Sequence, residues 1–292
     1  MFKGTGTALI TPFNDDLSVD YASLHQITRV QIEGGINALI VLGTTGESPV
    51  IDNEERKKII TTVQEEVNGK IPVIVGTGTN DTMHVVELNK MAEDLKVDGL
   101  LIVNPYYNKG TQKSVTEHYK YISERTSLPI ILYNVPSRTG MNILPETAIK
   151  IFEDCKNVIG IKEASGNISQ IAELIAHKPE PAVVFSGNDD QTLPIMALGG
   201  VGVVSVFSNA YPHLMSKLTD ALLKGDFKEG RKLNNKFNDM MNKLFIESSP
   251  SPVKYVMSKL GYCKNTLRLP LSKITEKSES VLNETMLKLD SK

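Results

Sequence analysis

The chain has 292 residues, of which 40% are hydrophobic and 23% are charged, and its formal net charge at pH 7 is −2. This length and composition suit one large domain with ample material for a core. The near-neutral charge gives no electrostatic argument for binding nucleic acid or an anionic membrane.

The cysteine content and the first segment indicate where the protein works. Cys155 and Cys263 are the two cysteines of the chain, too few for a disulfide framework, so a reducing compartment is expected. The opening segment MFKGTGTALITPFNDD is too briefly apolar for a signal peptide. No stretch approaches the roughly 18 uninterrupted apolar residues of a membrane helix. These features predict a soluble, cytoplasmic protein.

Short apolar runs rich in Val, Ile and Leu recur through the first two-thirds of the chain. They lack strict alternation, as expected of strands that are covered on both faces in a parallel sheet. The runs are GTALI (6–10), NALIVLG (37–43), IPVIVGTG (71–78), DGLLIVNP (98–105), LPIILYNVP (128–136), VIGIKE (158–163), AVVFSG (182–187) and GVVSV (202–206).

Segments with apolar residues at spacings of three and four separate these runs, for example at 21–35, 53–69 and 81–97. Several of them begin at Asp or Asn and end near Gly, which are favourable helix caps. Eight strands that alternate with helices predict an α/β fold, a (β/α)8 TIM barrel. An open doubly wound sheet is the alternative, and the count of eight strands disfavours it.

The last part of the chain has a different pattern. The segments 213–226, 229–248, 252–261 and 279–290 are helix-like and follow one another without strands between them. No low-complexity linker precedes them. The sequence therefore predicts a barrel core over residues 1–207 and a C-terminal helical extension over residues 208–292 that packs on the barrel.

Reactive side chains gather where the predicted strands end, which is the edge that carries the chemistry of such barrels. If the barrel forms, these groups meet at one mouth although they span more than half of the core. The groups are Gly43-Thr44-Thr45-Gly46-Glu47-Ser48, Asn104-Pro105-Tyr106-Tyr107-Asn108, Tyr133-Asn134 with the loop 135–140, Lys162-Glu163, and Ser186-Gly187-Asn188-Asp189-Asp190.

Lys162 is the most informative of these residues because it ends an apolar run, whereas most other lysines lie in charged helical segments. On the inner face of a barrel, loss of hydration disfavours the ammonium form. A neutral amine can attack a ketone and form a Schiff base, whose protonated nitrogen is an electron sink. The alternative is a structural lysine paired with a neighbouring carboxylate such as Glu163.

Three further groups suit a Schiff-base lysine. The motif GTTGE (43–47) offers two hydroxyls and backbone N–H groups to a small carboxylate, although a phosphate cradle or a plain glycine turn remains open. Tyr133 can relay a proton to a bound carbonyl, or it is a packing residue. Arg138 has the fork geometry for a substrate carboxylate, or it forms a surface ion pair.

The sequence predicts neither a metal site nor a dinucleotide site. The histidines are isolated and lack paired ligand spacing. Asp189-Asp190 favours the start of the following helix over a cation site, and no Gly-rich dinucleotide fingerprint follows a strand. The histidines are His25, His84, His118, His177 and His213.

The motifs GTTGES, NPYYN, YNVPSRTG and GIKEASGN occur in this order, and with them the chain resembles the dihydrodipicolinate synthase family. That family belongs to the pyruvate-dependent class I aldolases and lyases, together with N-acetylneuraminate lyase. The resemblance runs from Gly4 to the segment LRLPL (267–271). It implies the condensation of pyruvate with L-aspartate 4-semialdehyde to 4-hydroxy-tetrahydrodipicolinate, on the diaminopimelate route to lysine, with no cofactor. It also implies a homotetramer built as a dimer of dimers.

The resemblance further implies a catalytic role for residues that match the family's motifs. Lys162 would form the Schiff base with pyruvate. Tyr133, Thr44 and Tyr107 would form a proton relay, with Tyr107 reaching in from the neighbouring subunit of a tight dimer.

Substrate-binding roles follow from the resemblance in the same way. Thr45 and the adjacent backbone would hold the carboxylate of pyruvate, aided by the backbone of Gly187 and Val204 at the mouth. Arg138 would bind the carboxylate of the aldehyde and orient Tyr133. Sialic acid lyases lack the S-R-T-G arrangement after YNVP and typically have GSTGE, so Arg138 favours the synthase over these relatives.

One departure concerns regulation. Ser48, Asn80 and Tyr106 match the inhibitor site of lysine-inhibited members of the family, but His84 stands where those members have a glutamate. Loss of that carboxylate removes a charge-assisted contact with the ammonium of lysine, so inhibition is expected to be weak or absent.

A hypothesis from another functional class is a catalytically silent barrel that binds a keto acid as a sensor. Such relatives normally lose the lysine or a residue of the relay, and this chain retains all of them.

Overall fold

A computed structural model describes residues 2–290. Eight strands form one closed barrel in chain order, and helices connect them. The predicted (β/α)8 TIM barrel is confirmed, and the open-sheet alternative is wrong. The strands are β1 (Gly4–Ala8), β2 (Ala38–Val41), β3 (Val73–Gly76), β4 (Gly99–Val103), β5 (Ile130–Asn134), β6 (Val158–Glu163), β7 (Val183–Ser186) and β8 (Gly202–Ser205).

The chain divides into two compact units, which are described one at a time below. The first unit comprises Met1–Val73 and Ser205–Lys292, and the second comprises Ile74–Val204. These units are not the barrel core (1–207) and the helical extension (208–292) expected from the sequence. That division stays a prediction.

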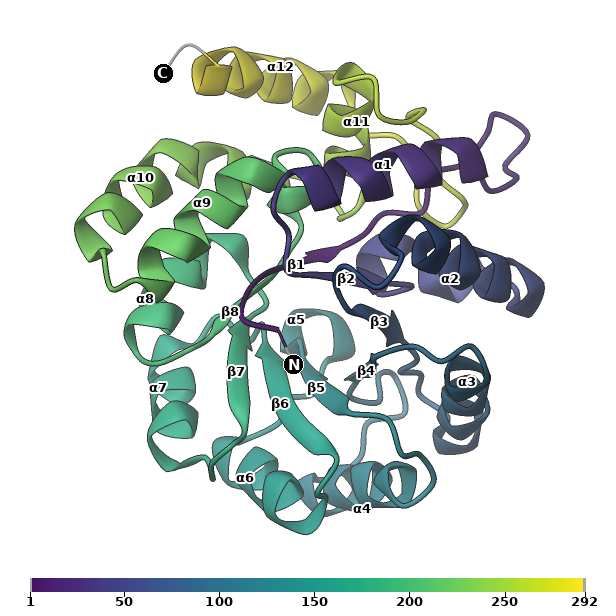
Figure 1. The fold of residues 1–292 in the computed structure, drawn as a ribbon, viewed down its shortest axis with the longest axis vertical. Coiled ribbons are helices and arrows are strands. Elements are labelled where there is room, and N and C mark those ends of the chain that lie inside the picture. Colours follow the sequence, from purple (N-terminus) through teal and green to yellow (C-terminus); the bar gives the residue numbers. More distant parts are fainter. Residues whose placement is uncertain (1, 291–292) are drawn as a thin grey trace. The chain divides into compact units, whose positions relative to one another are not determined.

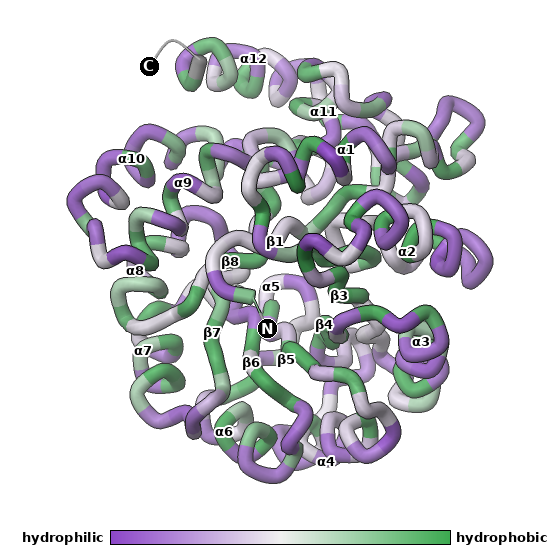
Figure 2. Tube along the Cα trace, in the orientation of Figure 1, coloured by the Kyte–Doolittle hydropathy of each residue, from purple (hydrophilic) through white to green (hydrophobic). Residues whose placement is uncertain are grey.

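In the second unit, helices cover the outer side of a parallel sheet (Figure 1). The strands β5 and β6 are almost entirely buried because helices cover one face and the barrel interior covers the other, which explains their lack of alternation. Figure 2 shows the hydrophobic colouring of β6 and β7. The helices are α3 (Thr82–Asp94), α4 (Gln112–Ser123), α5 (Pro136–Thr139), α6 (Pro145–Asp154), α7 (Ile168–His177) and α8 (Thr192–Ala197).

The register of this sheet aligns three residues that matter for the site. Tyr133 of β5 pairs with Lys162 of β6, and Lys162 pairs with Phe185 of β7. Paired residues in a parallel sheet project from neighbouring strands at the same height, so the strand ends place these side chains side by side.

In the first unit, α1 (Tyr21–Glu33) packs on α2 (Asn53–Val67), and four later helices complete the structure. Asp52 and Glu55 form a capping box at the start of α2, one residue before the Asn53 with which the predicted helix-like segment begins. The helix α9 lies against β1, and α10 lies against both α9 and α12. The four helices of the predicted extension are α9 (Pro212–Leu223), α10 (Phe227–Lys243), α11 (Ser251–Lys259) and α12 (Glu276–Asp290).

None of the helices within residues 2–290 combines the length and the apolar character that crossing a membrane requires.

Candidate active site

Lys162 and Tyr133 lie together at the ends of neighbouring strands. Lys162 is 5% exposed and Tyr133 is 7% exposed, and Lys162 Nζ lies 4.2 Å from the centre of the Tyr133 ring. No carboxylate in residues 2–290 forms an ion pair with Lys162. The lysine therefore combines burial, an aromatic neighbour and the lack of a counter-charge, which are the conditions that favour a nucleophilic amine.

Glu163 points away from Lys162 and belongs to a different network. Asn134 Nδ2 donates to both carboxylate oxygens of Glu163, at 3.2 and 3.0 Å, and the backbone N–H of Ser165 donates at 2.7 Å. Asn134 Nδ2 also donates to Asn142, which in turn donates to Gln170 on α7. Glu163 thus faces the helix layer, and burial raises the pKa of its carboxyl group.

The alternation of side chains along a strand settles the orientation of the lysine. Because successive residues point to opposite faces and Glu163 points toward the helices, Lys162 points into the barrel interior. The same alternation separates Tyr133 from Asn134 on β5. The alternative of a structural pair between Lys162 and Glu163 is therefore wrong.

Arg138 lies on the exposed side of the short helix α5, which follows directly after β5. The loop around it is well anchored, since Thr139 Oγ1 donates to Met141 O at 2.8 Å and Asn104 Nδ2 donates to Met141 O at 3.0 Å. Arg138 has no ion pair among the described residues, so the surface ion pair considered from the sequence does not form. Its guanidinium remains available for a ligand carboxylate.

Gly187 directly follows β7, and Val204 is the penultimate residue of β8. The backbone N–H of Gly187 donates to Glu163 O at 2.7 Å, which ties the end of β7 to the end of β6. A Cβ on Gly187 would lie 2.6 Å from Ala164 Cβ, so this position admits only glycine without a shift of backbone. Val204 is fully buried in β8.

Thr44 and Thr45 lie in the first unit, on a single 3-10 turn (Thr44–Gly46) that follows β2. Thr45 is buried and Thr44 is half-buried. Thr11 Oγ1 donates to Gly46 O at 2.7 Å, and a Cβ on Gly46 would press on Leu9 O at 3.2 Å. This close approach explains why Gly46 of the motif is a glycine. The turn carries both threonines and is anchored by the Thr11 hydrogen bond, and its role in binding a carboxylate stays a prediction.

Tyr107 differs from the other candidates because it is 89% exposed and has a left-handed backbone with φ 69. Its side chain makes no contribution to a buried site within its own described chain. The residues considered for an inhibitor site, namely Ser48, Asn80, His84 and Tyr106, are all half-buried. His84 Nδ1 lies 3.1 Å from Glu87 on the same helix.

Within residues 2–290, no group of three or more His, Cys, Asp and Glu side chains is arranged to hold a metal ion. Asp189 begins a 3-10 turn (Asp189–Gln191) that leads into α8, in agreement with the helix-start interpretation.

Two buried polar networks at the strand ends escaped the sequence reasoning. One is the Asn134–Glu163 network described above. The other joins Glu47, the last residue of the GTTGE motif, to Lys254 on α11, and neither side chain is accessible to solvent. In the sequence, the signal for the second network was Lys254, a lysine within the largely apolar run SPVKYVM (251–257).

Comparisons with known proteins agree with this geometry. A model of the dihydrodipicolinate synthetase family matches residues 1–289. The 4-hydroxy-tetrahydrodipicolinate synthase of Thermotoga neapolitana is 49% identical over 285 residues, which cover 97% of each chain. The crystal structure of dihydrodipicolinate synthase from Thermotoga maritima has a TM-score of 0.98 at 46% identity and covers 99% of each chain.

A further solved structure, described as a monomeric dihydrodipicolinate synthase variant, has a TM-score of 0.97 at 46% identity and covers 99% of this chain and 97% of its own. Matches of this extent and identity, together with the barrel and its strand-end lysine, establish the family. The chain belongs to the dihydrodipicolinate synthetase family, a family of lyase enzymes.

Proposed function

We propose that this chain is a 4-hydroxy-tetrahydrodipicolinate synthase that condenses pyruvate with L-aspartate 4-semialdehyde. The observation that carries the proposal is the buried amine of Lys162, which faces the barrel interior beside Tyr133 and has no carboxylate partner in the described chain. Family membership supplies the substrates. The product belongs to the diaminopimelate route to lysine.

The first half of the reaction activates pyruvate. The Lys162 amine attacks C2 of pyruvate, and loss of the carbonyl oxygen as water leaves a protonated Schiff base. Its positive nitrogen draws electrons from the C3–H bond, and loss of that proton gives a nucleophilic enamine. Tyr133 is suited to move the protons because its phenol both donates and accepts. No cofactor is needed, because the lysine nitrogen itself serves as the electron sink.

The second half forms the carbon–carbon bond and closes the ring. C3 of the enamine adds to the aldehyde carbon of L-aspartate 4-semialdehyde, and the aldehyde oxygen takes up a proton to become the 4-hydroxyl group. The amino group of the semialdehyde then attacks C2, and the Lys162 amine leaves. Arg138 is placed to bind the carboxylate of this second substrate, since it is exposed and unpaired in the described chain on the loop after β5.

The remaining roles come from the family. Thr45 would hold the pyruvate carboxylate with the backbone of Gly187 and Val204, and Thr44 would join Tyr133 in the proton relay. Support comes from the turn of Thr44 and Thr45, which is well anchored within its own unit.

A second copy of the chain would complete the relay. Tyr107 would reach into the site of the neighbouring subunit in a dimer, and two such dimers would form a tetramer. The support is its 89% exposure and its left-handed backbone, which is unfavourable for a tyrosine and suits a residue held by a contact. We also expect the enzyme to work in the cytoplasm, since Cys155 and Cys263 are free thiols.

Borohydride reduction in the presence of pyruvate tests the proposal. Reduction converts the Schiff base into a stable secondary amine, so mass spectrometry should find pyruvate-derived mass on the peptide that contains Lys162. Lys162→Ala should abolish both the adduct and turnover, while the control Lys156→Ala, an exposed lysine, should retain them. Unmodified parent protein would favour a keto-acid sensor.

A coupled assay identifies the second substrate. Pyruvate should react with L-aspartate 4-semialdehyde and not with N-acetylmannosamine. Preference for the sugar would instead place the chain with the sialic acid lyases.

A further inference from the structure

Glu47 directly follows the turn of Thr44 and Thr45, and its carboxylate is bound by residues from the last part of the chain. It is 2% exposed. Lys254 Nζ on α11 forms an ion pair with Glu47 Oε1, and the backbone N–H of Arg268 donates to Glu47 Oε2 at 3.1 Å. All of these residues belong to the first unit. Both carboxylate oxygens are therefore occupied by donors that lie more than 200 residues away in the sequence.

Lys254 is held as tightly as its partner. Its side chain is fully buried, its Nζ also donates to Thr266 O at 3.0 Å, and it lies 4.1 Å from the centre of the Phe13 ring. Burial lowers the pKa of the Lys254 ammonium, whereas the charge of Glu47 acts in the opposite direction. A buried charge is tolerated only when it is paired, so each member of this pair needs the other.

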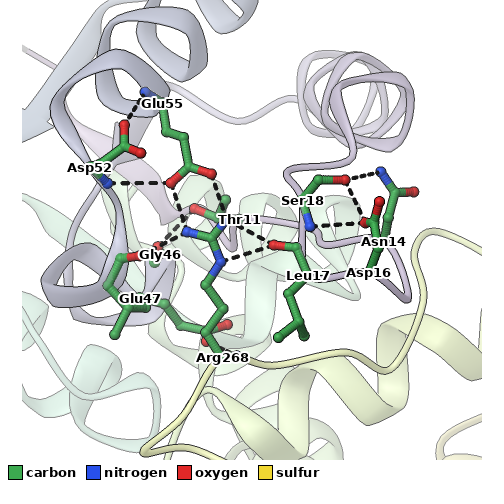
Figure 3. Close-up of polar contacts among 11 residues, drawn as sticks. Thr11, Asn14, Asp16, Leu17, Ser18, Gly46, Glu47, Asp52, Glu55 and Arg268 are labelled. Atoms are coloured by element: carbon green, nitrogen blue, oxygen red, sulfur yellow. Dashed lines mark hydrogen bonds and ion pairs between the residues drawn. The ribbon is translucent and has the colours of Figure 1, made fainter.

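Arg268 holds the segment that follows Glu47, as Figure 3 shows. Its Nη1 donates to Val50 O at 2.7 Å, its guanidinium pairs with Glu55 of α2, and its Nη2 donates to Leu17 O at 2.8 Å. Val50 N in turn donates to Glu47 O at 3.1 Å. The backbone after the turn is thus fixed to the same distal segment that binds the Glu47 carboxylate.

The backbone of Glu47 explains why this fixation is needed. Glu47 adopts the left-handed conformation with φ 55 and ψ 35, which is unfavourable for a residue with a Cβ. Such a conformation persists only where the surrounding structure imposes it, and it occurs preferentially at functional sites. The buried ion pair is the contact that holds this residue, and with it the end of the turn that bears Thr44 and Thr45.

We propose that Glu47 and Lys254 are positioning residues that hold the Thr44–Gly46 turn in the geometry that binds the carboxylate of a 2-oxo acid. The inference rests on the proposed function, in which Thr45 binds that carboxylate. Neither residue touches substrate. They act on the substrate through the turn. Their substitution should therefore weaken binding of the keto acid and leave binding of the aldehyde, whose carboxylate is assigned to Arg138, unchanged.

The test uses the full-length variants Glu47→Gln, Lys254→Met and the double variant. Glu47→Gln keeps the shape and the acceptor oxygen and removes the charge. The pyruvate concentration for half-maximal borohydride trapping, and the KM for pyruvate, should rise about 10- to 100-fold, as expected when a binding group is displaced. The KM for L-aspartate 4-semialdehyde should change less than about threefold. The KM for pyruvate of the double variant should not exceed that of the more impaired single variant, because the two residues act as one unit.

Glu66→Gln is the matched control, because it removes an ion-paired carboxylate of the same unit whose partners, Arg29 and His25, lie on α1. It should leave both KM values unchanged. If Glu47→Gln traps pyruvate with the half-saturation of the parent, or if both KM values rise together, the inference is wrong although the proposed function stands. If the parent traps no pyruvate, the proposed function itself fails. Glu47→Gln decides the matter should Lys254→Met not fold.

Discussion

Lys162 and Tyr133 are register partners across β6 and β5, and the amine lies 4.2 Å from the centre of the phenol ring. Both side chains therefore start from hydrogen-bonded strands and not from loops. A site built on strands holds its groups more precisely than a site on loops, which suits a reaction that moves protons between these two residues and a bound substrate.

Tyr133→Phe should lower kcat by about 100- to 1,000-fold, because it keeps the ring that packs beside Lys162 and removes the hydroxyl that transfers protons. The melting temperature should stay near that of the parent. Steady-state kinetics and calorimetry check the two expectations.

Tyr119→Phe provides the opposite control. It removes a buried hydroxyl that donates to Ile102 O at 3.0 Å, so it should cost about 1 kcal/mol of unfolding free energy and leave kcat unchanged. Equal kcat in Tyr133→Phe and the parent would remove Tyr133 from the relay.

Arg138→Ala should separate the two halves of the reaction. Borohydride trapping of pyruvate should persist, because Lys162 and its surroundings are untouched. The KM for L-aspartate 4-semialdehyde should rise by about 10- to 100-fold, which corresponds to the loss of a charge-assisted contact worth about 1.5–3 kcal/mol. Use of the aldehyde with the efficiency of the parent would point to another second substrate.

Lysine should inhibit weakly or not at all. The side chain at position 84 is an imidazole and therefore offers no carboxylate to the ammonium of lysine. It is half-buried and lies beside Glu87 on α3. A titration of activity with lysine is expected to show no half-inhibition below about 1 mM, which corresponds to a binding free energy weaker than about −4 kcal/mol. His84→Glu should strengthen any inhibition. Sub-millimolar inhibition of the parent would contradict the expectation.

Gly187→Ala should destabilise the protein by about 1–3 kcal/mol, because the new Cβ would lie 2.6 Å from Ala164 Cβ and 3.1 Å from Glu163 O. The strand ends must move apart, so pyruvate trapping should weaken as well. Gly43→Ala is the stability control, since its Cβ would meet nothing within 4 Å, and it should change unfolding free energy by less than about 0.5 kcal/mol. Urea unfolding of both variants decides between crowding and a general intolerance of alanine.

His118 should make stability depend on pH. It is buried on α4, its Nδ1 is hydrogen-bonded to Thr82 Oγ1 at 2.9 Å, and burial lowers the pKa of His118 to about 4. Between pH 6.5 and about 4, His118 therefore binds more protons in the unfolded chain than in the folded chain. Stability should fall as pH decreases through this window, by at most about 3 kcal/mol.

Urea unfolding at pH 7 and pH 5 measures this effect. His118→Gln should flatten the dependence, whereas the exposed His177→Gln should not. An unchanged slope in His118→Gln would assign the acid sensitivity to carboxyl groups.

Much of the fold was accessible from the sequence because it depends on local patterns. The eight apolar runs and the helical spacing between them predicted the barrel, and the strand β6 has the predicted bounds 158–163. The motifs at the strand ends predicted a set of candidate site residues, of which Lys162 and Tyr133 lie side by side in the structure. Hydrophobic periodicity and strand-end motifs are properties of short segments, so they can be recognised before any long-range contact is known.

The tertiary structure alone decided which way the strand-end side chains point and what holds them. The alternation along β6 is implied by any strand, but only the partners of Glu163 on the helix side place Lys162 on the inside. The pairing of Glu47 with Lys254 joins residues 207 positions apart, and no spacing in the sequence encodes it. Such contacts arise when distant segments pack together, because a buried charge must find a partner wherever the fold supplies one.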